Sequence, residues 1–323
     1  MFRRSLFPVL AGLATVPLLA RTALAAWPDQ QIRMIVPYTP AGGPDMIGRF
    51  VGERLAPKLG QPVVVENIPG ASGNIGSQVV ARAKPDGNTI MSQVNTLVMP
   101  PSLYKNVPFD PMRDFAPVTL ATRTPMVLAV NPSLPVTSVK ELIALAKAKP
   151  GALSYGAASI GSTNHLAAEL FNSMAQVSIV FVPYKGIALA VNDLISDRLQ
   201  MMFPAASTGM PHAKSGRLRA LAVSTESPSP LAPGLPTVAS AGLPGFEAAF
   251  LTGMLVRAKT PPPLIQRLSS EIARVITNAE VKNRLFAIGI DAVGNTPDEL
   301  AQIMKIETAK WSQVIREAGI QPH

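Results

Sequence analysis

Two segments of the sequence combine glycine with hydroxyl side chains in the same way. The first is Tyr38-Thr-Pro-Ala-Gly-Gly-Pro-Asp45, and the second is Tyr155-Gly-Ala-Ala-Ser-Ile-Gly-Ser-Thr-Asn-His165. Each follows a strand-like run and opens a helix-like run. A helix start presents unpaired backbone N–H groups and about half a positive charge, and glycine lets a ligand approach that backbone. The pair therefore indicates a site that holds a small carboxylate without an Arg or Lys partner.

Taken singly, either segment is explained by ordinary turn chemistry, in which Gly, Ser and Asp act as turn residues and helix caps. One such segment in each half of the chain favours a binding site between two units. A third glycine-rich segment, Pro69-Gly-Ala-Ser-Gly-Asn-Ile-Gly76, lacks the Gly-Lys-Ser/Thr of a phosphate-binding loop and the glycine spacing of a dinucleotide site. It predicts a wall of a cleft and not a nucleotide site.

Side chains suited to catalysis are sparse. No Gly-x-Ser-x-Gly segment occurs, and although Ser162 and His165 lie three residues apart, no acidic residue is placed behind the histidine. We expect His165 to point toward the cleft or to cap locally. Asp45, Glu53 and Asp193 fall on helices, where such residues more often cap or face solvent. The sequence therefore favours a binding protein over an enzyme.

Metal and thiol chemistry have little support. The chain has no cysteine, and its three histidines, at positions 165, 212 and 323, are far apart. Disulfides, thiol catalysis and cysteine metal sites are excluded, and no His-Glu-x-x-His pattern exists. We expect neither a metal nor a cofactor.

The N-terminus has the pattern of a secretory signal peptide. Two arginines, Arg3 and Arg4, precede an apolar run over residues 6–20, and Ala23-Leu-Ala25 is a small-x-small cleavage site. A membrane anchor is the alternative, but the run is short and interrupted by Pro8 and Pro17. We therefore expect residues 1–25 to be removed near Ala25 after export to the periplasm by the Sec or twin-arginine route.

Charge does not indicate a nucleic-acid partner. The whole chain has 29 Lys and Arg against 20 Asp and Glu, and removal of Arg3, Arg4 and Arg21 with the signal peptide leaves 26 minus 20, or +6. The basic residues are dispersed, and few aromatic residues are available to stack on bases. A solvated basic surface is the simpler interpretation, and it would help draw anions toward a cleft.

Strand-like and helix-like segments alternate along the mature chain, which is typical of an α/β fold with parallel sheets. Short apolar runs predict strands at residues 32–38, 63–67, 89–93, 126–131, 153–156, 178–184, 199–203, 218–224 and 246–257. Periodic runs predict helices at residues 45–59, 73–83, 138–149, 163–174, 187–197, 262–277 and 297–318. The first helix is expected to bury Met46, Ile47, Phe50, Val51 and Leu55.

The absence of a long linker or repeat predicts two lobes without a flexible tether. We expect lobe 1 to comprise residues 26–124 and 253–323, and lobe 2 residues 125–252. The strands at 126–131 and 246–257 would then cross between the lobes as a hinge.

Several segments together resemble the Bug family, the substrate-binding receptors of tripartite tricarboxylate transporters. The matching segments are Ile32–Asp45, Gly60–Asn67, Pro69–Gly76, Lys84–Gly87, Tyr155-Gly156, Gly161-Ser162, His165–Phe171 and Pro183–Gly186. The resemblance covers essentially the whole mature chain. It implies a two-lobed periplasmic binding protein of the Venus flytrap type, with each lobe a mostly parallel sheet flanked by helices and with no cofactor.

The resemblance also implies which residues hold the ligand. In the family a ligand carboxylate sits between the two loops, commonly through bridging waters. The residues carried over are Tyr38, Thr39, Ala41, Gly42, Gly43, Asp45, Ser92, Asn95, Thr96, Ala158, Ser159, Gly161, Ser162, Thr163, His165 and Lys185. We expect a monomer that binds a small organic acid and delivers it to a membrane permease.

The sequence departs from the family pattern near residues 200–204. The family usually has an acidic residue after the Met-Phe run, whereas this chain reads Gln200-Met-Met-Phe-Pro204. The departure favours a simple carboxylate, an aromatic acid or an amide over an amino acid. Two alternatives stay open, a sensor that presents its ligand to a membrane kinase and, less favoured, an exported hydrolase or isomerase.

Overall fold

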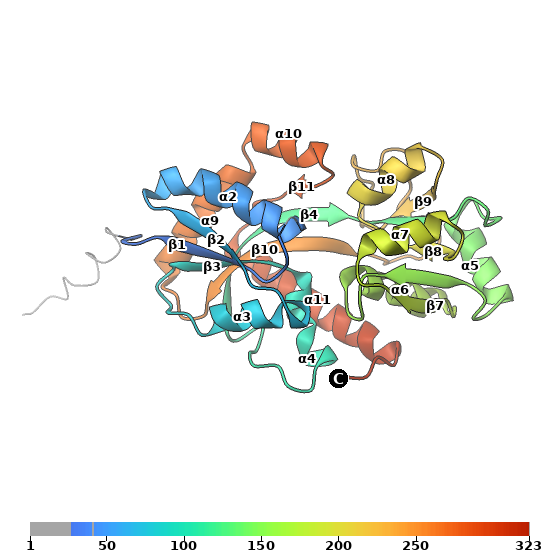
Figure 1. Ribbon diagram of the computed structural model, residues 1–323, viewed down its shortest axis with the longest axis horizontal. Helices are drawn as coiled ribbons and strands as arrows, with labels where there is room; N and C mark the ends of the chain where they lie inside the picture. The colour runs from blue at the N-terminus through green and yellow to red at the C-terminus, as the bar shows by residue number, and fades with distance from the viewer. Residues whose placement is uncertain (1–26, 41, 323) are drawn as a thin grey trace, which may run out of the picture.

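The computed structural model describes residues 27–40 and 42–322, which form two β-sheets with helices on both faces (Figure 1). The predicted signal peptide, residues 1–25, lies outside the described residues. Within those residues, no helix has the length and apolar character needed to cross a membrane.

The first sheet has six strands in the order β11-β4-β10-β3-β1-β2. Its strands are β1 (Ile32–Val36), β2 (Val63–Asn67), β3 (Thr89–Val94), β4 (Phe115–Pro125), β10 (Ala249–Arg257) and β11 (Asp291–Ala292). The helices around it are α2 (Gly43–Leu59), η1 (Ala71–Gly73), α3 (Asn74–Ala81), η2 (Asn95–Val98), α4 (Pro100–Leu103), α9 (Pro262–Ile276), α10 (Ala279–Ala287) and α11 (Pro297–Glu317). β1 runs parallel to β2 and β3, and the other pairs are antiparallel.

The second sheet has five strands in the order β7-β6-β8-β5-β9. Its strands are β5 (Val127–Val130), β6 (Ser154–Ala157), β7 (Val180–Pro183), β8 (Met201–Met202) and β9 (Arg219–Val223). Its helices are α5 (Val139–Ala148), α6 (Thr163–Ala175), α7 (Ile187–Ile195) and α8 (Ala206–Lys214). β6 is parallel to β7 and β8, whereas β5 is antiparallel to β8 and β9.

Both sheets are mixed, and the position of the antiparallel pairs explains why. Strands joined by a crossover helix are parallel, in agreement with the mostly parallel sheet that we expected in each lobe. The antiparallel pairs arise where the chain passes between the sheets. Figure 1 shows β4 and β10 lying side by side in the middle of the molecule, between the two groups of helices.

The crossing strands differ from the predicted pair. β10 pairs with β3 and with the 11-residue strand β4, which the sequence pattern did not identify. The segment predicted as its partner, residues 126–131, instead contributes β5 to the second sheet, directly after β4. On the return path, the N–H of Ala248 donates to the carbonyl of Ser224 at 2.9 Å, just before β10 begins.

Helix α2 packs on the first sheet through a stripe at helical spacing. Ile47, Val51 and Leu55 are fully or almost fully buried, in agreement with the predicted face. Met46, predicted to face inward, is instead 42% exposed, and Phe50 is only half-buried. The buried stripe is therefore narrower than predicted, and it leaves Met46 at the edge of the space between the sheets.

Strand β2, at the predicted residues 63–67, is an edge strand and is mostly half-buried. It has a neighbour on one side only, so its outer edge faces solvent. The Arg33 guanidinium pairs with the Glu66 carboxylate across β1 and β2 at 2.7 Å. That ion pair lowers the pKa of Glu66, and it covers the exposed face of the two strands.

The last long helix ties the two halves together. Trp311 of α11 and Phe171 of α6 belong to one buried apolar cluster that extends under both sheets. At the end of α11, the Ser173 hydroxyl donates to the Glu317 carboxylate at 2.5 Å. The helix starts at a capping box between Thr296 and Glu299, and proline follows the cap. Helix α11 therefore spans the junction as a rigid element.

Candidate functional site

The two glycine-rich segments lie where the sequence predicts, between a parallel strand and a helix. Residues 37–42 join β1 to α2, and residues 158–162 join β6 to α6. The N-cap residues are Gly42 and Ser162, both in extended backbone conformations, and neither supplies a side-chain cap hydrogen bond. The first-turn N–H groups therefore have no side-chain acceptor at their N-cap, which is the condition for binding an anion.

The space in front of α2 is open. A Cβ atom built on Gly43 would meet no heavy atom within 4 Å, and one on Gly42 would only touch the Thr39 carbonyl at 3.6 Å. Pro44 follows at the second helical position, where a missing N–H is tolerated. The helix start thus leaves room for a ligand group near Gly43.

Helix η2 brings the two loops into one site. The Tyr38 hydroxyl of the first loop bonds to the Thr96 hydroxyl at 2.6 Å. The Thr163 hydroxyl, on the first residue of α6, donates to the Asn95 side-chain oxygen at 3.3 Å. Asn95 and Thr96 are neighbours in the chain, so the two helix starts from different sheets meet on either side of η2.

Tyr38 is a fixed hydrogen-bonding group. Its hydroxyl donates to the Gln93 side-chain oxygen, which leaves its oxygen to accept from Thr96. Gln93 is held in turn by Ser77 of α3 at 3.0 Å, and Gly73 packs against the phenol ring. Burial raises the pKa of Tyr38, so the phenol stays neutral. The third glycine-rich segment thus forms the wall behind Tyr38.

Asp45 and Ser92 hold the first loop through bonds within the protein. The Asp45 carboxylate, 2% exposed, accepts from Asn67 at 2.8 Å and from Arg49 at 3.1 Å. Asn67 also donates to the Tyr38 carbonyl at 3.1 Å. The Ser92 hydroxyl donates to the Pro44 carbonyl at 2.9 Å. Both side chains therefore position the backbone of the loop.

The sequence allowed His165 either to point toward the cleft or to cap locally, and the structure shows the local arrangement. Its Nδ1 accepts a hydrogen bond from the Gly161 N–H at 3.1 Å, and its ring lies against Phe181 and Tyr155. Its Nε2 is 4.0 Å from the Glu169 carboxylate. Burial lowers the pKa of His165 to about 4, so the ring is neutral at physiological pH and shapes the second loop from below.

The remaining predicted residues lie at the surface of the two loops. Ala158 and Ser162 are half-buried, Thr39 and Ser159 are exposed, and the Ser162 hydroxyl donates to the Ser159 carbonyl at 2.7 Å. Lys185 is exposed between β7 and α7, and it makes no ion pair or hydrogen bond with the described residues. Ala41 lies outside the described residues.

The lobes contact each other on two sides of the site. On one side Gly161 packs so closely on Leu103 of α4 that an added Cβ would lie 2.3 Å from the leucine Cδ1. On the other side Gly289, after α10, abuts Ser207 at the start of α8, where an added Cβ would lie 2.6 Å from the serine Cβ. The space between the lobes is therefore bounded at both ends.

A cavity of about 320 Å³ occupies this space, and the sequence did not predict its walls. It starts at Tyr38 and Gly43 of the first loop and continues along β4 and β10 to the start of α8. The residues that sequence reasoning missed include Thr122, Thr124, Phe250, Thr252, Ile288 and Ile290. The alternation Thr122-Arg-Thr124 could have predicted that both threonines face the cavity, since alternate residues of a strand face the same side.

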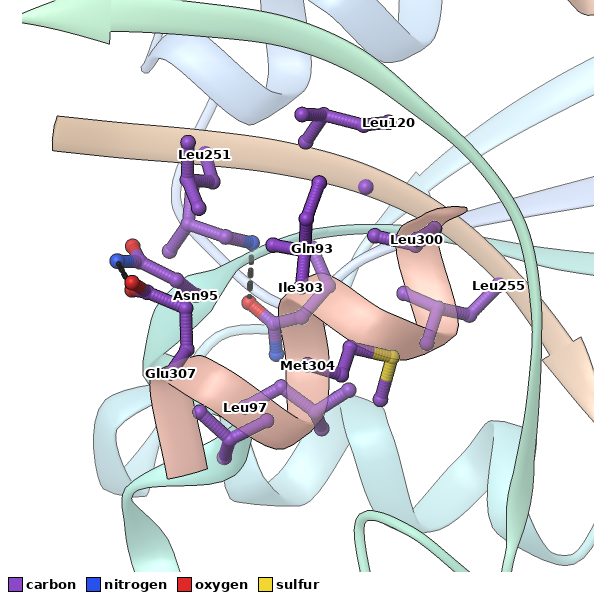
Figure 2. A pocket seen from close by; sticks show the side chains of 13 residues that line it. Gln93, Asn95, Leu97, Leu120, Leu251, Leu255, Leu300, Ile303, Met304 and Glu307 are labelled. Atoms are coloured by element: carbon purple, nitrogen blue, oxygen red, sulfur yellow. Dashed lines mark hydrogen bonds between the residues drawn. The ribbon is translucent and has the colours of Figure 1, made fainter. Parts of the chain in front are cut away.

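A second cavity lies on the opposite face of the first sheet and is too small for a ligand. It measures about 30 Å³, roughly the volume of one water molecule. Figure 2 shows its apolar walls, with the Asn95 amide pointing at the Glu307 carboxylate at one end and Gln93 above. Glu307 also accepts from the Trp311 indole at 2.7 Å and pairs with Lys310. The Asn95 amide nitrogen is thus held by Glu307, while its side-chain oxygen accepts from Thr163.

No group of three or more His, Cys, Asp or Glu side chains in the described part of the chain is arranged to hold a metal ion.

The chain is similar over most of its length to known proteins of one family. Residues 47–320 match the family model described as tripartite tricarboxylate transporter family receptor. The protein BugT of Bordetella pertussis is 34% identical over 309 residues, which is 95% of this chain and 95% of BugT. Both comparisons span nearly the whole of the described chain.

Solved structures give the same result. The R. palustris protein Rpa4515 with adipate is 36% identical and superposes with a TM-score of 0.79, covering 92% of this chain and 100% of the other. The periplasmic binding protein BugD is 31% identical with a TM-score of 0.76, covering 92% of this chain and 100% of BugD. The two-lobed architecture is therefore that of known periplasmic binding proteins.

Proposed function

This chain belongs to the family of tripartite tricarboxylate transporter receptors, and we propose that it captures a small carboxylate between its two lobes in the periplasm for uptake. The family is one of solute-binding receptors that act with a membrane transporter. The arginine pair and apolar run near the N-terminus support export with removal of residues 1–25, by either the Sec or the twin-arginine route.

One observation carries the proposal: two helix starts without a side-chain cap, one from each sheet, meet on either side of η2. Each start directs backbone N–H groups and the positive end of a helix dipole at the space between. Together they form a site for one carboxylate that needs neither a lysine nor an arginine. The bound adipate in the similar protein Rpa4515 is consistent with a carboxylate ligand.

The predicted site residues divide into two roles. We assign direct contact with the ligand to the two loops, through Tyr38, Thr39, Ala41, Gly42, Gly43, Ala158, Ser159, Gly161, Ser162 and Thr163. Asp45, Ser92, Asn95, Thr96 and His165 position those loops by the hydrogen bonds given above. Lys185 is exposed between β7 and α7, and its charge would attract an anion over a distance.

We propose that the site binds without catalysis. Ser162 and His165 are not arranged as nucleophile and base, because the Ser162 hydroxyl donates to the Ser159 carbonyl and His165 Nδ1 accepts from Gly161. Of the two His165 ring nitrogens that could act as a base, Nδ1 already accepts a hydrogen bond, and Nε2 belongs to a buried side chain. We further propose that one chain is the functional unit, since its own two loops complete the site.

We also propose that the lobes divide close to the predicted boundaries at residues 124 and 253. β4 ends at Pro125, directly before the second sheet begins with β5. β10 starts at Ala249, directly after the chain leaves the second sheet. Ligand release would then require bending at these two strands and parting of the contacts at Gly161 and Gly289.

Thermal unfolding with a library of organic acids tests this function. A ligand that binds only the folded chain raises its stability by RT ln(1 + [L]/Kd), which is about 2.7 kcal/mol at a hundredfold excess over Kd. We expect one class of acids to raise the melting temperature in this way, in a concentration-dependent manner. Turnover of a bound acid, followed by NMR, would instead show an enzyme.

A further inference from the structure

The cavity between the lobes has walls without charge. Its lining side chains, all described, include no Asp, Glu, Lys, Arg or His. Most of the surface comes from apolar groups such as Ile47, Phe250 and Ile290. Met46 and Ile288, 42% and 48% exposed, stand at its mouth. A ligand body placed here would meet mainly carbon.

The polar side chains in the cavity wall are uncharged, and two of them are threonines that are buried as residues and face the cavity. Thr122 and Thr252 lie opposite each other in the pairing of β4 with β10, and they are 1% and 6% exposed. Neither hydroxyl makes a hydrogen bond with any described residue. Both hydroxyls line the cavity and are not used within the protein, so the pair is suited to a neutral hydrogen-bonding group on a ligand.

The cavity is continuous with the carboxylate site. Tyr38 and Gly43 belong both to the first ligand loop and to the cavity wall, and Ala205 and Ser207 close it from the second lobe. Its volume of 320 Å³ is at the lower end of the range of about 300–1,000 Å³ found for small-molecule pockets. A ligand whose carboxylate lies at the helix starts would therefore extend its body along β4 and β10.

A second carboxylate in this cavity would be poorly accommodated. It would lose its hydration and meet no cation, and a buried unpaired charge is far more costly than a buried hydrocarbon. Threonine hydroxyls can donate single neutral hydrogen bonds, which compensate only part of that cost. The geometry thus distinguishes acids with one ionised end from acids with two.

We propose that the ligand is a monocarboxylate whose alkyl or aromatic body fills the cavity along β4 and β10, with any polar group at its far end uncharged. This inference rests on the proposed function and narrows its ligand class. It distinguishes the chain from Rpa4515, the similar protein solved with the dicarboxylate adipate.

Matched acids test the inference by isothermal titration of the mature chain, freed of retained ligand by unfolding and refolding. The pairs are hexanoate against adipate and 4-hydroxybenzoate against terephthalate. We expect the monocarboxylate of at least one pair to bind ten times more tightly or better. Equal or tighter binding of the dicarboxylates would overturn the inference and leave the proposed function intact. Binding of no carboxylate, in these pairs or in the wider library, would overturn both.

A charge-introducing variant makes the test sharper. Thr124→Lys places a cation on the half-buried part of the wall, and we expect it to improve the affinity for the dicarboxylate of each pair relative to its monocarboxylate by tenfold or more. Ile306→Lys, at a position 54% exposed on α11, adds the same charge away from the cavity and should leave the selectivity unchanged. The same selectivity in Thr124→Lys and wild type, with both folded by thermal melt, would contradict the placement of the ligand body.

Discussion

The Gly161 N–H donates to His165 Nδ1 at 3.1 Å, so the glycine-rich loop before α6 is shaped by a buried, neutral imidazole. Protonation of Nδ1 would remove this acceptor and place a charge against Phe181 and Tyr155. The bond therefore links the shape of a ligand loop to the protonation state of one histidine.

Stability should decrease in acid because of His165. Its pKa is about 4 in the folded chain and about 6.5 when unfolded, so the unfolded state alone gains a proton as the pH falls from 6.5 to 4. The full effect is about 3 kcal/mol, and it stops growing below the folded pKa. Urea titrations across this range should show a larger loss of stability in wild type than in His165→Gln.

Glu169, which lies next to His165, also titrates differently in the folded chain, but it does not account for a difference between wild type and His165→Gln. Burial raises its pKa, so its contribution to stability grows as the pH falls, opposite in sign to that of His165. It is present in both proteins and should largely cancel from their difference. An unchanged pH dependence in His165→Gln would show that the imidazole is not held neutral.

A single backbone N–H can be removed from α6 to test its role. Thr163→Pro places proline at the first helical position, which the extended backbone of Ser162 allows, and it deletes one N–H. Thr163→Val removes the same hydroxyl and keeps the N–H. Because a hydrogen bond to a charged group contributes about 1.5–3 kcal/mol, Thr163→Pro should bind the acid about tenfold or more weakly than Thr163→Val in isothermal titration. Equal affinities would show that this N–H does not contact the ligand.

Gly161→Ala should weaken ligand binding by separating the lobes. The residue has φ +74°, where a non-glycine residue costs about 1–2 kcal/mol, and its Cβ would clash with Leu103. Adding Leu103→Ala relieves the clash and leaves the backbone strain. We therefore expect the double variant to regain part of the affinity lost in Gly161→Ala. Failure of the second change to restore any affinity would mean that the Leu103 contact does not limit closure.

Loss of the whole Asn95 side chain should lower the free energy of unfolding more than loss of its hydrogen bond to Thr163 alone. Asn95→Ala removes a donor from the buried Glu307 carboxylate and should lower the free energy of unfolding by about 1–3 kcal/mol. Thr163→Val removes only the 3.3 Å bond to Asn95 and should cost less than about 1 kcal/mol. Urea denaturation compares the two. A smaller loss in Asn95→Ala than in Thr163→Val would contradict this order.

The elements with clear apolar periodicity were predictable from sequence. β1, α2, α6 and α11 lie within a few residues of their predicted bounds, because burial on one face imposes its spacing on the sequence. Helix α8 was missed because it contains Gly209 and Pro211, and α10 because it buries only Val281 and Leu285. Their packing is set by partners distant in sequence.

The position of the two glycine-rich loops before α2 and α6 was predictable, and the cavity beside them was not. Local glycine and hydroxyl patterns mark Tyr38–Asp45 and Tyr155–His165, since a helix start is a local structure. The opposition of Thr122 and Thr252 depends on the pairing of two strands about 130 residues apart, and nothing local specifies that pairing. The sequence therefore predicts the two loops of the proposed carboxylate site and not the walls of the cavity beside them.

The most direct test of the carboxylate site is a crystal structure of the mature chain with the small molecule it retains through purification, identified by mass spectrometry. We predict an organic acid whose carboxylate oxygens lie within hydrogen-bonding distance, directly or through one water, of backbone N–H groups at the starts of both α2 and α6. A ligand bound outside the space between these two helix starts, or held there by a group other than a carboxylate, would contradict the account.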